Sequence, residues 1–146
     1  QIPTNVEEEG EEKEVQYRIL NEGKALNLNN FRVFPFPSCV FEMISLEYLD
    51  LSENSRFYLH TRLENLTNLT ELNLSFSKFE LEGGVFPQIP NLKKLTMKNA
   101  DHAQRKKIKI SVLPKSITSL DMTRCYSFLM GSISELQNLT TLNISG

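Results

Sequence analysis

The side chains best suited to catalysis or metal binding are few and widely separated in this sequence. Its two histidines are His60 and His102, and its two cysteines are Cys39 and Cys125. No Cys, Asp or Glu cluster with zinc-ligand spacing surrounds either histidine. A glycine-rich phosphate loop, a nucleophile elbow and an HExxH motif are all missing. We therefore expect no catalytic residue, metal or cofactor, and predict that these residues are not an enzyme; an enzyme domain fused outside them stays an open alternative.

Composition narrows the class of protein further. The chain has 146 residues, 40% of them hydrophobic and 23% charged, with a formal net charge of −2, which is typical of one globular domain. No apolar run approaches the roughly 18 residues that a membrane span needs. The near-neutral charge balance argues against a dedicated nucleic-acid binder, which usually has a strong excess of basic residues. A surplus of leucine (21) and asparagine (13) points instead to internal repeats.

One apolar pattern recurs along the chain. The segment Leu46–Asn54 has leucine at its first, fourth and sixth positions and asparagine at its ninth. Successive copies begin 23, 23, 23, 25 and 22 residues apart. The copies hold these positions at Gly23, Leu26 and Leu28; at Leu69, Leu72 and Leu74; at Leu92, Leu95 and Met97; at Ile117, Leu120 and Met122; and at Leu139, Leu142 and Ile144.

The spacing within each copy predicts a short strand. The fourth and sixth positions are two residues apart, so in an extended chain both side chains point to the same side. One strand of this kind cannot bury its leucines alone. Stacking of successive copies would pair the strands in a parallel sheet over one continuous core.

In these residues the chain resembles the leucine-rich-repeat family, whose motif LxxLxLxxN/C is matched in full by Leu46–Asn54. The resemblance covers residues 23–146 and implies an α/β fold. The expected architecture is a curved solenoid of about six repeats, with a parallel concave sheet and irregular or short helical convex returns. Residues 1–22 form an acidic lead-in, in which we expect an N-terminal capping helix over Glu11–Leu20.

The return segments carry more specific expectations. We predict short helical turns at Cys39–Ile44, Arg62–Leu66 and Ser132–Leu136, one irregular or 3₁₀ stretch at Gly83–Pro90, and a short strand near Ile108–Ile110. The family's ninth-position asparagine bonds the backbone of neighbouring turns, but here that position also holds Phe31 and Ala100. We therefore expect irregular loops after Asn30 and Asn99. Cys39 and Cys125 lie about four turns, or roughly 19 Å, apart, which excludes a disulfide.

The outward strand positions form columns across the expected concave face. Such a surface is rigid and extended, which suits a protein or peptide ligand. Tyr48 and Phe76 are the candidate aromatic anchors, although charges on this face can also serve only to keep it soluble. The sheet should be acidic toward its start and basic toward its middle. The candidate binding residues are Tyr48, Asp50, Glu71, Asn73, Phe76, Lys94, Thr96, Lys98, Asp121 and Arg124.

The leading hypothesis is a non-catalytic protein-recognition module within a longer protein, with further repeats or domains after Gly146. Two alternatives are a structural scaffold or assembly segment and the sensing or substrate-reading arm of an immune receptor or ubiquitin-ligase-type protein. The basic segment Arg105–Lys109 could contact a phosphate-bearing or acidic partner by charge, or be a solvated loop.

Five N-glycosylation sequons leave the cellular setting open. They could carry glycans, or they could follow from the NLTxLxLS habit of the repeat itself. The absence of paired terminal cysteines favours an intracellular over a secreted protein. The sequons begin at Asn65, Asn68, Asn73, Asn138 and Asn143.

Overall fold

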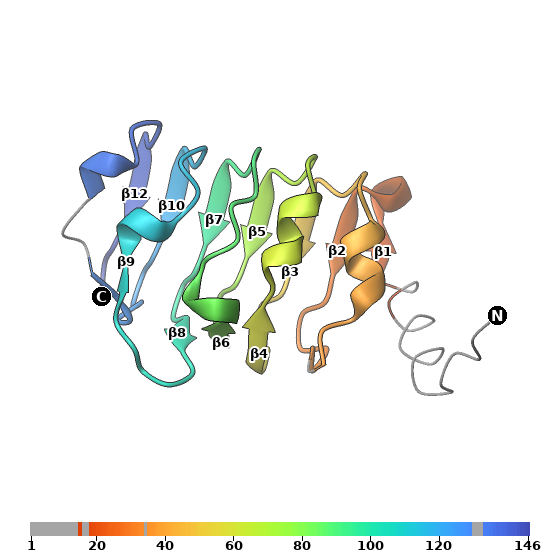
Figure 1. Cartoon of the computed structure of the whole chain (residues 1–146), viewed down its shortest axis with the longest axis horizontal. Coiled ribbons are helices and arrows are strands. Elements are labelled where there is room, and N and C mark those ends of the chain that lie inside the picture. Colours follow the sequence, from red (N-terminus) through yellow and green to blue (C-terminus); the bar gives the residue numbers. More distant parts are fainter. Residues whose placement is uncertain (1–14, 16–17, 34, 130–132) are drawn as a thin grey trace.

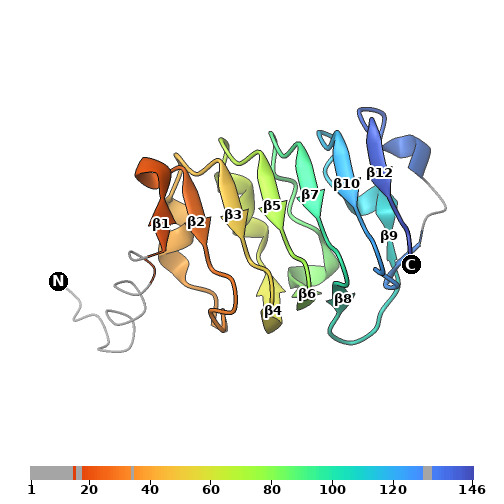
Figure 2. The same ribbon diagram turned by 180° about the vertical axis from the view of Figure 1, so that it is seen from behind.

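The computed structural model describes residues 15, 18–33, 35–129 and 133–146. Within them, one long sheet runs along the molecule with the strand order β1-β2-β3-β5-β7-β10-β12 (Figures 1 and 2). Its first strand pairs antiparallel with the second, and the remaining pairs are parallel. The strands are β1 (Ile19–Leu20), β2 (Ala25–Asn27), β3 (Tyr48–Asp50), β5 (Glu71–Asn73), β7 (Lys94–Thr96), β10 (Ser119–Asp121) and β12 (Thr141–Asn143).

The parallel strands pair in the register that the sequence pattern predicts. Leu49 lies opposite Leu72, which lies opposite Leu95. After each strand the sixth-position amide continues the pairing: the Leu51 N–H donates to Asn73 O and the Leu74 N–H donates to Thr96 O, both at 2.8 Å. The predicted parallel sheet and its register are therefore confirmed.

The core lies between this sheet and the return segments. The inward leucines of β2, β3, β5, β7 and β10 are buried, such as Leu49 and Leu95, whereas Leu142 of β12 is 37% exposed. From the other side, the aromatic rings of Phe57, Phe79 and Phe86 are also fully buried. These rings pack in the same core cluster as the strand leucines.

Short strands and 3₁₀ helices make up the return segments. The strands β4 (Ser55–Leu59), β6 (Lys78–Leu81) and β8 (Asp101–His102) form a second parallel sheet, and β9 (Ile108–Lys109) pairs with β11 (Phe128–Leu129). This mostly sheet structure with few helices is compatible with the predicted α/β class. The 3₁₀ helices are η1 (Asn21–Gly23), η2 (Ser38–Glu42), η3 (Thr61–Asn65), η4 (Glu82–Gly84), η5 (Ile110–Val112) and η6 (Ile133–Glu135).

Most expectations for the return segments are confirmed. Helical turns occur near Cys39 and Arg62 and, within the described residues, from Ile133 onward. One 3₁₀ turn, η4, covers the start of the Gly83–Pro90 stretch. The predicted strand near Ile108 is present as β9, although Ile110 already belongs to η5.

The expected irregular loop after Asn99 is wrong for the first residues that follow it and is confirmed for residues 103–107. Residues Asp101 and His102 form β8, because the backbone there pairs with the preceding return segment: the Asp101 N–H donates to Ser77 O at 3.0 Å. A side chain from the following repeat also holds it, since the His102 N–H donates to Ser127 Oγ at 3.0 Å. The loop after Asn30 is irregular as predicted over residues 31–33.

The prediction of a capping helix over Glu11–Leu20 is wrong at the C-terminal end of that segment. Ile19 and Leu20 are extended and pair with Leu26 and Ala25 of β2, because the open edge of the long sheet offers backbone partners there. Val15 is buried against the core. Val15 is helical, and the chain turns at Arg18, whose N–H donates to Val15 O at 2.9 Å. Residues 1–14, 16 and 17 lie outside the described part of the chain, and the domain boundary between residues 22 and 23 stays a prediction.

Ninth-position side chains bond the backbone of neighbouring turns where their chemistry allows. Asn54 is 1% exposed; its amide nitrogen donates to Leu28 O (2.9 Å) and Leu51 O (2.9 Å), and its oxygen accepts from Arg32 N (2.9 Å). Ser77 Oγ donates to Leu51 O at 2.9 Å. The sulfur of Cys125 approaches Ala100 O at 3.1 Å as a weak donor.

We expect Asn54→Ala to lower the free energy of unfolding by about 3 kcal/mol, because it leaves several buried backbone groups without partners. Asn91→Ala is the matched control, since the exposed Asn91 amide makes one bond, to Thr67 O at 2.6 Å; its cost should stay near ~1 kcal/mol. Urea denaturation of both variants measures the difference. Equal costs would contradict the structural role assigned to Asn54.

A carboxylate from one return segment caps the helix of the preceding one. Glu82 Oε2 accepts hydrogen bonds from the Thr61 N–H at 2.9 Å and the Thr61 hydroxyl at 3.0 Å, and Glu82 Oε1 lies 3.0 Å from His60 Nδ1. The Thr61 backbone bond, followed by the hydroxyl bond and the nearby imidazole, lowers the pKa of Glu82. The ionised form is therefore the one that stabilises the fold.

A lowered folded-state pKa means that the contribution of Glu82 is complete above the ordinary pKa of glutamate and disappears as the pH falls through the folded value. The stability difference between wild type and Glu82→Gln should therefore be largest at neutral pH and shrink in acid. Denaturation curves at stepped pH measure it. Thr61→Val should remove part of the same pH dependence, and a difference that grows in acid would contradict the assignment.

Candidate binding surface on the long sheet

Seven of the ten predicted binding residues lie next to a buried leucine in β3, β5, β7 or β10, so their side chains point away from the core. We call the surface that these residues form with the loops that follow the strands the outward face; Figure 2 shows these strands and loops. None of the ten is buried. Register aligns Tyr48, Glu71 and Lys94 in one row of neighbours. A second row contains Asp50, Asn73, Thr96 and Asp121. The loops that leave β5, β7 and β10 carry Phe76, Lys98 and Arg124.

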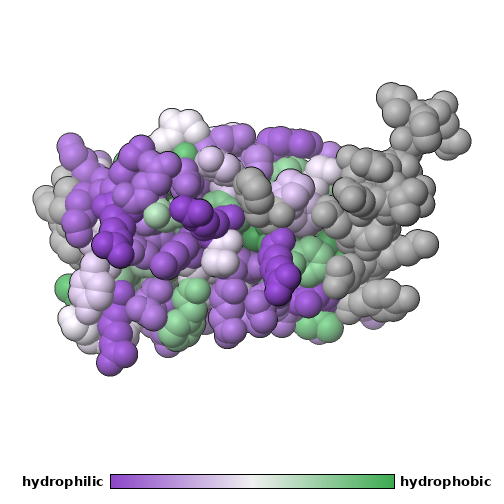
Figure 3. All heavy atoms as spheres, turned by 90° about the horizontal axis from the view of Figure 1, so that it is seen from below, coloured by the Kyte–Doolittle hydropathy of each residue, from purple (hydrophilic) through white to green (hydrophobic). Residues whose placement is uncertain are grey.

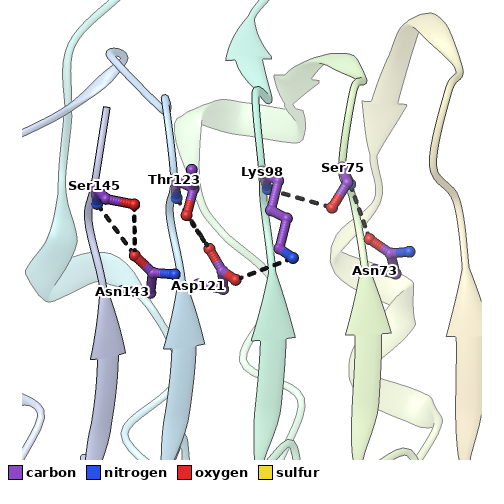
Figure 4. Close-up of polar contacts among 7 residues, drawn as sticks. All are labelled: Asn73, Ser75, Lys98, Asp121, Thr123, Asn143 and Ser145. Atoms are coloured by element: carbon purple, nitrogen blue, oxygen red, sulfur yellow. Dashed lines mark hydrogen bonds and ion pairs between the residues drawn. The ribbon is translucent and has the colours of Figure 1, made fainter.

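Most side chains of the second row also fix the turn that leaves their own strand. In each case an Asn or Asp oxygen accepts the backbone N–H two residues later, as in an Asx turn. Figure 4 shows three of these contacts. The bonds join Asn27 to Asn29 (2.9 Å), Asp50 to Ser52 (2.8 Å), Asn73 to Ser75 (3.0 Å), Asp121 to Thr123 (3.0 Å) and Asn143 to Ser145 (3.2 Å).

The second row is the fifth position of each copy of the pattern, and its structural role was not predicted from the sequence. The recurrence of Asn or Asp two residues before a polar loop position was a usable signal, because these side chains favour local bonds to the backbone. The exception is Thr96, for which no such bond occurs among the described residues. One side-chain oxygen of Asp50, of Asn73 and of Asp121 therefore already accepts a backbone hydrogen bond. Each of these side chains has fewer acceptor sites left for a ligand than its position on the face suggests.

Cross-strand ion pairs reduce the predicted charge separation on the outward face. The Lys94 ammonium lies 3.6 Å from Glu71 Oε2, and the Lys98 ammonium lies 3.5 Å from Asp121 Oδ2 (Figure 4). Burial of Asp121 by itself raises the pKa of its carboxyl, but hydrogen bonds from Thr123 and the Lys98 charge lower that pKa overall. The basic middle of the sheet is thus partly neutralised, because its lysines reach carboxylates on adjacent strands.

Tyr48 is held against the sheet. Its hydroxyl donates to Asp50 Oδ2 at 3.2 Å, and burial, followed by the charge of Asp50, raises the pKa of Tyr48. The ring borders a shallow hollow of about 150 Å³ whose walls include Glu71, Lys94 and Thr96. This hollow offers mainly polar groups to a ligand.

The eighth position adopts a left-handed backbone in the first five copies of the pattern. This conformation is strained for a bulky side chain and costs roughly 1–2 kcal/mol outside glycine, so Asn and Gly are favoured there. Phe76 nevertheless adopts it, with 58% of its surface exposed. The φ values are 50° at Asn30, 58° at Glu53, 57° at Phe76, 51° at Asn99 and 55° at Arg124.

Phe76 also borders a larger hollow beside the loops that leave β5, β7 and β10. Its volume is about 410 Å³, and its lining includes Lys98, Asn99, Thr123 and Arg124. Among the described residues, Arg124 takes part in no ion pair. An aromatic face, a guanidinium group and an ammonium group therefore converge on one exposed depression.

The residues with catalytic chemistry do not converge. No three His, Cys, Asp or Glu side chains in the described ranges gather as a metal site. His60 bonds Glu82, and His102 is buried with its pKa lowered by that burial. Neither cysteine forms a disulfide within the described residues, and burial raises the pKa of Cys125 to about 11, so its thiol stays protonated at neutral pH.

Comparisons with known proteins support the leucine-rich-repeat family. A family model described as "Leucine Rich repeat" matches residues 65–86, which include β5, β6 and η4. Adenylate cyclase from Schizosaccharomyces pombe is 26% identical over 125 residues. That alignment covers 86% of this chain but 7% of the cyclase. No helix within the described residues is both long and apolar enough to cross a membrane.

We expect Phe76→Asn to raise the free energy of unfolding by about 1 kcal/mol, because asparagine tolerates the left-handed backbone at little cost. Asn99→Ala, at the equivalent position of the next repeat, should lower it by about 1 kcal/mol for the same reason. Thermal and urea denaturation compare the two variants. A loss of stability in Phe76→Asn would show that Phe76 is a packing residue.

Proposed function

We propose that this chain is a non-catalytic protein-recognition module, a curved solenoid of six leucine-rich repeats that binds a protein or peptide through its outward face. The family supports the broader role of a protein-interaction module. On this proposal the outward face is the concave face that the family resemblance implies. The candidate anchors are Tyr48 and Phe76, surrounded by the remaining predicted residues.

The single observation that carries the proposal is the conformation of Phe76. An aromatic ring that is 58% exposed gains little from burial, while its left-handed backbone costs stability. Strain of this kind persists at functional sites, and exposed aromatic residues become the main energetic contacts when a partner covers them. We infer that the Phe76 ring packs against an apolar side chain of the ligand or enters an apolar pocket on it.

The charges near Phe76 indicate the character of that ligand. Lys98 already pairs with Asp121, whereas Arg124 has its guanidinium group free for a carboxylate. A peptide with an apolar residue next to an acidic one would satisfy both Phe76 and Arg124. Tyr48, farther along the sheet, would contact a second part of the same extended ligand.

The match to adenylate cyclase favours a second candidate function. The chain spans about 7% of that relative's length, so the cyclase activity is that protein's, and only the idea that this chain belongs to a longer enzyme is taken from it. In this alternative the chain is a non-catalytic recognition segment of a longer enzyme, which corresponds to a substrate-reading or sensing arm. The outward face would serve the same purpose in both cases.

Selection of a random peptide display library on the immobilised chain tests the proposal. Enriched peptides should bind wild type and lose at least 10-fold in affinity with Phe76→Asn, even though this variant is expected to be more stable than wild type. Tyr126→Ala is the matched control, because Tyr126 is 65% exposed but lies in a return segment after β10. It should change the affinity less than 2-fold.

Two results would count against the proposal. The first is enrichment of peptides that bind wild type and Phe76→Asn equally well, which would place binding elsewhere. The second is a failure of the library to enrich any peptide above an unfolded control.

A further inference from the structure

A basic loop interrupts the regular stacking of the return segments. The strand β8 ends the second sheet, and β9 starts a separate pairing with β11, so the intervening residues 103–107 connect two sheets. This loop extends away from the body of the molecule (Figure 1). It lies in the copy of the pattern that begins at Leu92. The next copy begins 25 residues later, whereas the other intervals are 22 or 23 residues.

The loop borders a hollow of about 280 Å³ that is separate from the outward face. Three of its lining residues are lysines, Lys106, Lys107 and Lys109, and Ile108 and Val112 supply apolar surface. Figure 3 views the molecule from the side toward which this loop extends, and hydrophilic residues dominate that side with isolated apolar ones between them.

The positive charges of the loop are not neutralised locally. Arg105, Lys106, Lys107 and Lys109 form no ion pair with any carboxylate in the described part of the chain; the Lys107 ammonium donates instead to the backbone oxygen of Tyr126. This contrasts with Lys94 and Lys98 on the outward face, which pair with carboxylates on adjacent strands.

One carboxylate, Glu80, also lines the hollow. Its Oε2 accepts a hydrogen bond from Gln104 Nε2 at 2.8 Å, which holds the carboxylate toward the loop wall. Three lysines against one glutamate leave the lining with a net positive charge of two. The hollow therefore attracts an anion of charge two more strongly than a singly charged one.

His102 adds a fixed hydrogen-bond donor. Its ring Nδ1 accepts the Gln104 N–H at 3.2 Å, so the neutral imidazole carries its proton on Nε2. His102 is 6% exposed, its backbone is paired in β8, and the residue lines the hollow. A donor held this rigidly can orient an oxygen that the flexible lysines attract by charge.

From these contacts we infer that the hollow binds a phosphate monoester dianion, with the lysines and His102 around the phosphoryl oxygens and the organic group against Ile108 and Val112. Lysine ammonium groups bind phosphate as point charges. The apolar surface would contact the organic group of an ester, which an inorganic phosphate ion lacks. This site is independent of the outward face and of its ligand.

Titration of the chain with phenyl phosphate, monitored by amide chemical shifts, tests the inference. We expect the largest shifts at His102, Lys106 and Lys109. The triple variant Lys106→Gln, Lys107→Gln and Lys109→Gln should weaken binding at least 10-fold. The matched control Lys24→Gln, Lys93→Gln and Lys115→Gln removes the same charge outside the hollow and should change binding less than 2-fold.

Two further ligands distinguish the chemistry. Inorganic phosphate should bind at least 10-fold more weakly than phenyl phosphate, because it lacks the organic group, and phenyl sulfate should bind at least 5-fold more weakly, because it carries one charge. The inference is overturned by equal losses in the two triple variants, by equal affinity for phenyl phosphate and inorganic phosphate, or by shifts confined to other regions. Binding of phenyl phosphate to the triple variant with wild-type affinity would also overturn it.

Discussion

The hydrogen-bonded register between consecutive strands of the long sheet determines the position of every other group in this protein. The bonds that continue the pairing beyond each strand are short and uniform: Leu28 to Asp50, Leu51 to Asn73 and Leu74 to Thr96, each at 2.8 Å. A shift by one residue would turn the inward leucines to solvent and the outward polar residues into the core. The same register therefore defines both the core and the candidate binding surface.

Three features of the turn that leaves each strand maintain this register. An Asn or Asp in the second row accepts the N–H two residues later, the eighth position becomes left-handed, and the ninth-position side chain bonds the neighbouring turn where it can. These local requirements compete with binding for the same residues. Phe76 is the clearest case in which the local requirement is violated, since its exposed ring occupies a backbone conformation better suited to asparagine. We regard that conflict as the strongest indication of function on the outward face.

Much of the long sheet could be predicted from the sequence because one period sets both strand position and side-chain direction. Apolar spacing was sufficient to assign β3, β5 and β7 and to place the ten candidate residues on one face. The strand at Asp101 was not predictable from Ala100, because its pairing depends on Ser77 O in the preceding repeat and on Ser127 Oγ in the following one. Nor could the spacing foresee the ion pairs of Lys94 and Lys98, since a column shows which residues are neighbours but not which side chains meet. Whether the outward face binds a ligand stays a proposal.

Amide hydrogen exchange tests the central claim most directly, because it reports on each bond of the register. We predict that the amides of Leu51, Leu74 and Met97 exchange slowly and with similar protection, since all three donate to the following strand. The amides of Lys106 and Lys107, in the loop between β8 and β9, should exchange far faster. Exchange of the strand amides at the rate of these loop amides would contradict the in-register sheet on which the outward face depends.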